Sequence, residues 1–358
     1  MANTIHLGEK YREALLEGFR EKSYTESSFS HALDQTFSGV RTVHVMSLKT
    51  EPLQDYNRNV SVGSGSRYGE TTEVGDFVQT FTMTQDKALS LSVDKGNNAE
   101  QFNVKKAGAI MAAERDEHIV PYLDRYRLEK WAKEAGIHKS LSAEPTKSSI
   151  VSEIIELHNE MMDAGVPASG CTLFIPRKYV PALKLSSEWT ALDSLGGKSL
   201  PTGSIGEVDG LAVKPIPTSR FPSGAYFMIL HKDAVIAPMK INDFKGHTDP
   251  PGLSGDLLEF RMMFDAFVLG PKCNGVAVAC AASSVAAAPT ITLSSGNATL
   301  ASTTSGAVML YTTDGSDPRY SKDAKTYTAA FPAAAGTRIR AVATNDGMFS
   351  SDLTEETA

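Results

Sequence analysis

The chain has 358 residues, with 42 acidic and 35 basic side chains and a formal net charge of −7. Hydrophobic residues make up 41% and charged residues 22%, an ordinary globular composition that excludes a disordered or fibrous chain. The length predicts two or three domains, and the acidic balance argues against a protein whose main work is coating nucleic acid.

The N-terminal residues and the cysteines indicate the compartment. Glu9, Lys10 and Arg12 interrupt any signal-peptide core, and no run reaches the roughly 18 apolar residues that a membrane helix needs. Three cysteines favour a reducing compartment over a disulfide framework, and Cys273 and Cys280 lack the spacing of a zinc site. We therefore expect a chain made in a cytoplasm, with no membrane segment and no metal.

Residues 1–39 predict a loose N-terminal arm, and residues 40–95 predict a long two-stranded antiparallel excursion. In the excursion, apolar and polar residues alternate on either side of a glycine-rich segment, 57–70. An isolated two-stranded ribbon is only marginally stable in water, and ordering each residue costs about 1–2 kcal/mol of backbone entropy. The ribbon must therefore pack on its own body or on a neighbouring subunit, and its threonine-rich face and charged tip favour the neighbour.

The tip of this excursion carries the expected intersubunit contact residues. They are Arg58, Arg67, Tyr68 and Glu70. Exposed ion pairs are worth little singly, so we expect these residues to orient a contact more than to stabilise it.

Residues 96–276 predict a mixed α/β body that begins with a long helix over 98–136. Pro121 is expected to kink or divide this helix, and Gly136 to end it. A second helix is predicted from Ser149, with serine caps, to Ala164. Apolar runs bounded by proline and glycine predict strands at 172–176, 211–215, 225–230, 234–238 and 260–269.

The C-terminal part predicts a separate module. Residues 277–288 are rich in alanine and carry no charge, which indicates a linker or an edge segment leading into one. Short alternating strands over 289–358 predict a small β-sandwich. Asp314, Asp317 and Asp323 lack the spacing of a calcium loop, so we expect Asp314-Gly315 to reverse a hairpin.

No motif in the sequence predicts catalysis. The segment GGKS at 196–199 has Leu192 where a phosphate-binding loop needs glycine, and the glycine-rich segment 63–69 is followed by no helix. The eight histidines are scattered, and no nucleophile has an evident base. We therefore expect a protein that is not an enzyme, with no catalytic residue, no cofactor site and no metal site.

The order of the elements and four segments resemble the major capsid proteins of tailed bacteriophages, which have the Hong Kong 97-type shell fold. The segments are GSIGEVDG at 203–210, LAVKPIPTSRFP at 211–222, HKDAVIAP at 231–238 and MMFDAFVL at 262–269. The resemblance covers about residues 1–280 and implies an α+β fold. It makes 40–95 an extended loop that reaches a neighbour, 98–136 the spine helix of the peripheral domain, and parts of 140–280 the axial domain.

A second resemblance covers the C-terminal module. The segments VMLYTTDGSDPRYS at 308–321 and TRIRAVATNDGMFSS at 337–351 are similar to the immunoglobulin-like module at the C-terminus of chitobiase and β-hexosaminidase-type enzymes. That module is not catalytic in those enzymes. On a phage shell protein, the resemblance implies an immunoglobulin-like β-sandwich, 289–358, displayed on the outer surface.

Together the resemblances imply a major capsid protein that self-assembles into the hexamers and pentamers of an icosahedral phage head. The expected partners are other copies of the chain, double-stranded DNA held without sequence recognition, a separate scaffolding protein unless the arm itself guides assembly, and portal and decoration proteins. Assembly is expected in the host bacterial cytoplasm, and the mature location is the virion.

The alternative function is that of a carbohydrate-binding surface or adhesion protein acting through 289–358. Tyr311, Tyr320 or Tyr327 would make the weak sugar contact. Both tryptophans, Trp131 and Trp189, lie outside this module, so it lacks the strongest stacking platform.

Overall fold

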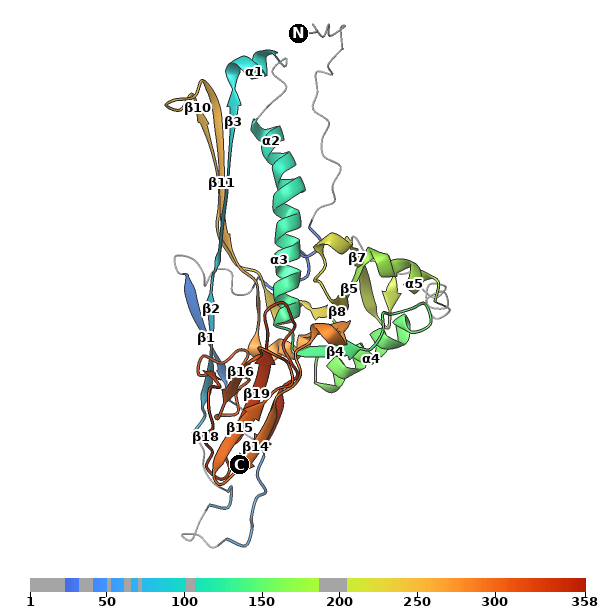
Figure 1. Cartoon of the computed structure of the whole chain (residues 1–358), viewed down its shortest axis with the longest axis vertical. Helices are drawn as coiled ribbons and strands as arrows, with labels where there is room; N and C mark the ends of the chain where they lie inside the picture. The colour runs from blue at the N-terminus through green and yellow to red at the C-terminus, as the bar shows by residue number, and fades with distance from the viewer. Residues whose placement is uncertain are drawn as a thin grey trace.

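The computed structural model describes residues 23–31, 41–49, 53–60, 66–69, 73–100, 107–186 and 205–358. Of the predicted N-terminal arm only 23–31 is therefore described, and Glu70 lies outside the described residues. The molecule is elongated: a long helix and a three-stranded sheet rise from a mixed α/β body, and an all-β C-terminal module lies toward the opposite end (Figure 1).

A six-stranded mixed sheet forms the centre of the body. Its strand order is β4 (Ile137–Leu141), β13 (Val276–Ala281), β8 (Ala225–His231), β5 (Cys171–Pro176), β7 (Leu211–Ile216) and β6 (Glu207–Val208). Strand β13 is parallel to β4 and antiparallel to β8, and β5 is parallel to β7. The strands predicted at 172–176, 211–215 and 225–230 are thus confirmed, and they form adjacent parts of one sheet.

Helices cover both faces of this sheet. Helix α4 (Ile150–Asp163) and the short α5 (Val180–Lys184) pack on one face, where apolar residues of α4 recur at helical spacing. The C-terminal half of the long helix packs on the other face, with Trp131 fully buried. Helix α4 has the predicted bounds and ends before Gly165, whose φ is +84°, but the side chain of Ser149 caps no backbone N–H.

The prediction of an alanine-rich linker over 277–288 is wrong for its first part, whereas residues 282–288 connect β13 to β14. Residues Val276–Ala281 form β13, which lies between β4 and β8. Ala277 and Ala279 face the α4 side of the sheet, and Val278 and Cys280 face the long helix. A strand buried on both faces carries an unbroken apolar run, which in composition alone looks the same as a small-residue linker.

The peripheral part combines a three-stranded sheet with the long helix. Strand β11 (Gly255–Phe264) pairs antiparallel with both β10 (Met239–Thr248) and β3 (Gln85–Asp94). The two-stranded ribbon therefore consists of β1 (Thr42–Leu48) and β2 (Asp76–Thr82) alone, and the predicted ribbon of 40–95 is wrong for its last part. The alternation of apolar and polar residues in β3 indicates which face of the strand is buried. It does not indicate the partner strand, β11, which is distant in the sequence.

The bounds of the long helix also differ from the predicted 98–136. Helix α1 (Lys95–Glu100) follows β3, and one helical run then comprises α2 (Ala107–Glu114), a π-helical turn (Arg115–Ile119) and α3 (Val120–Lys133). Pro121 does not divide the run, because the wider π turn precedes it and relieves the clash of its ring with the preceding turn. Gly136 lies beyond the helix, where an added Cβ would come 2.5 Å from the Cys273 carbonyl.

The C-terminal module is a β-sandwich of two antiparallel sheets. One sheet contains β14 (Thr290–Ser294), β15 (Asn297–Ala301) and β18 (Phe331–Pro332); the other contains β17 (Lys325–Thr326), β16 (Val308–Thr312), β19 (Arg338–Thr344) and β20 (Thr354–Thr357). Leu300, Phe331 and Ile339 fill its core. Asp314 and Gly315 do not reverse a tight hairpin as predicted. They lie in the long loop between β16 and β17.

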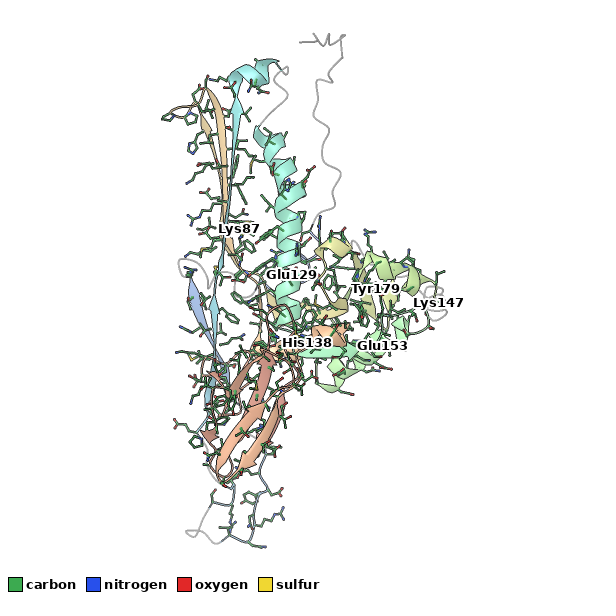
Figure 2. The ribbon with its side chains drawn as sticks, in the orientation of Figure 1. Lys87, Glu129, His138, Lys147, Glu153 and Tyr179 are labelled. Atoms are coloured by element: carbon green, nitrogen blue, oxygen red, sulfur yellow. The ribbon has the colours of Figure 1, made fainter. Side chains whose placement is uncertain are left out.

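Small strands and the module complete the core around the foot of the long helix. The strand pair β9 (Val235–Ile236) and β12 (Phe267–Val268) lies there. Tyr320 and Phe349 of the module belong to the same apolar cluster as Trp131. Figure 2 shows His138 where the long helix, the body and the module meet. The module therefore shares a core with the body instead of hanging from a linker.

Replacing Ala279 by leucine tests the position of β13. Ala279 is fully buried, so the extra side-chain volume should lower the free energy of unfolding by about 1–3 kcal/mol. Urea denaturation of the full chain measures this change. The exposed Ala288 provides the control, because Ala288→Leu should leave the unfolding free energy unchanged. Equal stability of both variants would mean that β13 is not a central strand.

The burial of His138 predicts a pH dependence of stability. Burial lowers the pKa of His138 from 6.5 to about 4, while its Nε2 lies 2.8 Å from the carbonyl oxygen of Ala132. The unfolded chain takes up this proton below pH 6.5 and the folded chain does not, so stability is lost as the pH falls toward 4. This group should lower the free energy of unfolding by about 2 kcal/mol between pH 7 and pH 5.

Urea denaturation at several pH values, compared between the wild type and His138→Gln, isolates this contribution. The variant should show a flatter dependence over the same interval, whatever its absolute stability. Parallel pH profiles for the two proteins would contradict the assignment.

Candidate assembly surface

The root of the ribbon is anchored on the chain's own body. Val43, Phe81 and Met83 are buried in one apolar cluster with Ile236 and Phe267 of β9 and β12. The rings of Phe81 and Phe267 lie 4.9 Å apart. This end of the ribbon therefore needs no neighbour to hold it.

A buried carboxylate, Asp265, holds the junction between the ribbon and the rest of the molecule. Its oxygens accept hydrogen bonds from the Thr84 backbone N–H (2.8 Å), the Thr84 hydroxyl (2.9 Å) and the Tyr126 hydroxyl (2.7 Å). Burial, together with this hydrogen bond to Asp265, raises the pKa of Tyr126. Because Thr84 separates β2 from β3 and Tyr126 lies on α3, Asp265 fixes the ribbon relative to the long helix.

Gln79 provides a second attachment on β2. Its amide donates to the carbonyl of Val268 at 2.9 Å, and its side-chain oxygen accepts from the Gly270 N–H at 2.8 Å. The amide nitrogen and oxygen of one side chain thus bind the backbone at the end of β12 and just after it. The ribbon is clamped at two levels along β2.

The outer part of the ribbon exposes apolar side chains. Met46 and Leu48 are 73% and 76% exposed, and Leu53, Tyr56 and Val74 are also exposed. Described parts of the segment between β1 and β2 extend past the module in Figure 1. Contiguous exposed apolar residues are characteristic of protein–protein contact surfaces. We call this set, completed by Tyr68, the ribbon surface.

The predicted contact residues are only partly brought together. Arg58 is exposed, whereas Arg67 donates from Nε to the Val60 carbonyl at 2.9 Å. The ring of Tyr68, which is itself exposed, lies 5.0 Å from that of Tyr56, so the two arms of the loop meet there. The fourth predicted residue, Glu70, lies outside the described residues.

The sequence reasoning missed the apolar members of the ribbon surface. Val43 and Val45 are the inward residues of β1, and Met46 and Leu48 are its outward ones. The signal was present, because apolar residues on both faces of a strand at its outer end indicate that both faces are covered in the assembled state. The sequence analysis predicted contacts for the charged residues of the tip and not for these apolar residues.

A second buried carboxylate, Asp124, anchors the described part of the N-terminal arm. It accepts hydrogen bonds from the hydroxyls of Ser23 (2.6 Å) and Thr25 (2.7 Å) and from Arg220 Nη1 (3.1 Å). Asp124 lies on α3, so it fixes Ser23 and Thr25 to the long helix. No pattern in the sequence linked Asp124 to residues about a hundred positions earlier.

The tyrosines predicted for sugar contact are engaged elsewhere. Tyr320 is buried in the body core and donates its hydroxyl hydrogen to the Glu134 carbonyl. The ring of Tyr311 stacks on Phe331 at 4.0 Å, and Tyr327 packs on the same residue. Burial removes Tyr320 from the predicted sugar contact, whereas Tyr311 and Tyr327 are half-buried packing residues and their predicted sugar contact stays a prediction.

The described residues contain no group of three or more His, Cys, Asp or Glu side chains that could hold a metal ion. Within the same residues, no helix is long and apolar enough to cross a membrane. The three cysteines are free thiols, and burial raises the pKa of Cys171 to about 11 and that of Cys280 to about 12. High thiol pKa values make these side chains poor nucleophiles.

A mixed α/β body, a long helix beside a three-stranded sheet, and a protruding ribbon define the fold of phage capsid structures. The chain is similar to a structure from Mycobacterium phage Che8, with a TM-score of 0.58, 17% identity, and coverage of 78% of this chain and 98% of that one. It is similar to the mature capsid of bacteriophage PhiM1, with a TM-score of 0.59, 12% identity and coverage of 78% and 92%. The capsid of the cyanophage P-SCSP1u gives a TM-score of 0.55, 11% identity and coverage of 77% and 93%.

These similarities confirm the predicted Hong Kong 97-type fold. The family model of the chitobiase/beta-hexosaminidase C-terminal domain matches residues 285–355, which confirms the second resemblance. No curated protein matches the sequence. The chain thus combines a capsid fold with an appended all-β module.

Asp265→Ala tests the junction of the ribbon. The substitution removes the acceptor of the half-buried Tyr126 hydroxyl and of two hydrogen bonds from the exposed Thr84, so the free energy of unfolding should fall by about 1–3 kcal/mol. Urea denaturation measures the change. Asp243→Ala removes an exposed carboxylate from β10 and should change the same quantity by less than about 0.5 kcal/mol. Similar losses in both variants would remove Asp265 from this role.

Proposed function

We propose that this chain is the major capsid protein of a tailed bacteriophage and that it assembles into hexamers and pentamers of an icosahedral head around double-stranded DNA. The capsid structures that share its fold support this proposal. The single observation that carries it is a ribbon anchored at its root by Asp265 and exposed and apolar at its outer end.

The energetics of the ribbon favour a neighbouring copy as its partner. Burying exposed apolar surface stabilises a contact by about 25 cal/mol for each Å² removed from water. Obligate homo-oligomeric contacts bury about 2,000 Å² or more, and a protruding two-stranded ribbon can lie along an adjacent subunit over such an area. The exposed tip residues Arg58, Arg67 and Tyr68, with Glu70, orient that contact.

The negative net charge of the chain is consistent with a shell that encloses DNA without binding it tightly. A shell lined with basic side chains would bind the DNA phosphates tightly and hinder both packing and release. The net charge of −7 avoids this binding and leaves the DNA held without sequence recognition.

Other partners follow from the same proposal. The anchor at Asp124 holds Ser23 and Thr25 on the long helix, and the N-terminal arm guides assembly itself or meets a separate scaffolding protein. Portal and decoration proteins complete the head. The subunits assemble in the host bacterial cytoplasm, and the mature protein is part of the virion. The chain has no catalytic role in this proposal.

The double substitution of Leu48 and Leu53 by aspartate tests the ribbon surface. Burying each leucine contributes about 1.5–3 kcal/mol to a contact, and an aspartate in its place must be desolvated. We expect a folded subunit and a loss of shells of more than about tenfold. Electron microscopy and sedimentation measure the shells, and circular dichroism checks the fold.

The matched control replaces the same two leucines by methionine, which keeps the apolar surface and should keep the shells. Shells of normal number and shape from the aspartate variant would overturn the assignment of this surface to assembly.

A further inference from the structure

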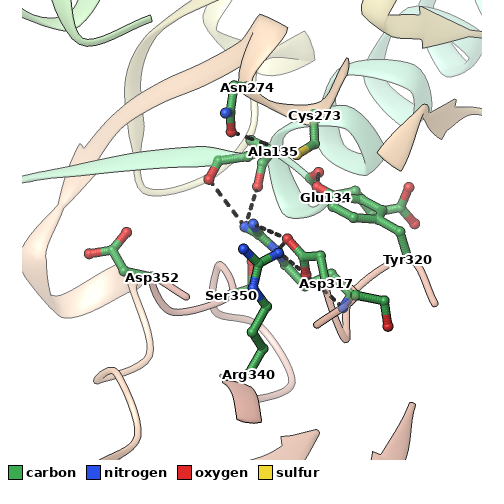
Figure 3. Close-up of polar contacts among 12 residues, drawn as sticks. Glu134, Ala135, Cys273, Asn274, Asp317, Tyr320, Arg340, Ser350 and Asp352 are labelled. Atoms are coloured by element: carbon green, nitrogen blue, oxygen red, sulfur yellow. Dashed lines mark hydrogen bonds and ion pairs between the residues drawn. The ribbon is translucent and has the colours of Figure 1, made fainter. Parts of the chain in front are cut away.

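Four successive backbone carbonyls, from the last residue of the long helix to the third residue after it, accept hydrogen bonds from the C-terminal module. The carbonyl of Lys133 accepts from the Ser350 hydroxyl at 3.3 Å, and that of Glu134 accepts from the Tyr320 hydroxyl. The carbonyls of Ala135 and Gly136 accept from Arg319 Nη1 at 2.9 and 3.2 Å. Figure 3 shows Glu134 and Ala135 facing Asp317 and Tyr320 across this contact.

These contacts complete the C-terminus of the helix. The last carbonyls of a helix have no partner within it, and a cation near them also interacts favourably with the helix dipole. Arg319 is only 7% exposed, and Asp317 holds it through paired hydrogen bonds, one of them 2.7 Å long from Nη2. The guanidinium is thus oriented by the module itself before it meets the helix.

The loop that caps the helix also touches the ribbon. The Lys322 N–H donates to the Val78 carbonyl on β2 at 3.0 Å. Tyr320 packs against Gly270, where an added Cβ would lie 3.0 Å from the Cβ of Tyr320 and 3.2 Å from the side-chain oxygen of Gln79. One loop of the module therefore reaches both the helix end and strand β2.

The module is attached at a third place by its strand connection after β19. The Phe349 N–H donates to the Ser284 carbonyl at 2.8 Å, and the Phe349 carbonyl accepts from Ala286 at 3.0 Å. The Phe349 ring stacks on that of His138 at 5.6 Å. The module is therefore attached to the helix, to β2 and to the body beside β4.

We propose that the C-terminal module is an intramolecular brace that caps the long helix and fixes strand β2 of the ribbon against it. Through residues 317–322 the module joins the long helix to β2, in addition to the link through Asp265. Loss of the brace exposes the helix carbonyls and weakens β2, whose two-stranded pairing is marginal without added contacts. The module is then a working part of each subunit, whatever its outer face displays.

Full-length Arg319→Ala and Tyr320→Phe, studied as unassembled subunits by hydrogen exchange with mass spectrometry, test the brace. In Arg319→Ala, exchange should become about tenfold faster in residues 130–137 and also in 76–82, while β5 and β8 keep wild-type rates. Tyr320→Phe keeps the buried ring and removes one hydrogen bond, so it should give a smaller increase in the same two segments. Arg338→Ala is the matched control, because Arg338 pairs with Glu355 within the module, and its rates should equal those of the wild type.

Unchanged exchange in 76–82 in both test variants would overturn the brace, even if the helix end became faster. If Arg319→Ala does not fold, Tyr320→Phe alone decides by the same criterion. The effect of these variants on shells rests on the proposed capsid function, whereas exchange in the unassembled subunit does not. Failure of the wild type to form shells would therefore contradict the proposed function and leave the brace to be decided by the exchange rates.

Discussion

The buried carboxylate of Asp265 is the interaction on which the arrangement of this molecule depends. It binds the turn between β2 and β3 and the hydroxyl of Tyr126 on the long helix, from its own position at the end of β11. A ribbon of two strands has no third strand to set its direction. Its direction is therefore set where it leaves the body, and Asp265 with Gln79 determines that point.

An anchored root and an exposed apolar outer end give the ribbon two different roles. The root around Phe81 is part of the subunit's own core, whereas Leu48 and Leu53 are exposed in the single chain. The structure therefore does not support the expectation that the whole ribbon relies on a neighbouring subunit. The inner part is independent of a neighbour, and the outer part is the surface that an adjacent copy would cover.

The C-terminal module has the core of a separate domain but is also bonded to two elements of the capsid fold. Its sandwich has its own core around Phe331, as a separable domain would. Its loop over 317–322 nevertheless caps the long helix through Arg319 and meets β2 through Lys322. An added domain that binds two elements of its host becomes part of the host's framework, because removing it would leave carbonyls and apolar side chains without partners.

The sequence by itself determined the elements whose burial follows a clear period: α4, the strands β5, β7 and β8, the inward face of β1, and the two resemblances in their correct order. The tertiary structure alone decided that β3 pairs with β11, that β13 with Ala277 and Ala279 is a central strand, and that Arg319 reaches the helix end. Periodicity records which face of an element is covered but not which distant element covers it. Buried polar partners such as Asp124, Asp265 and Arg319 leave no period at all, since a single side chain finds its donors or acceptors only after the chain has folded.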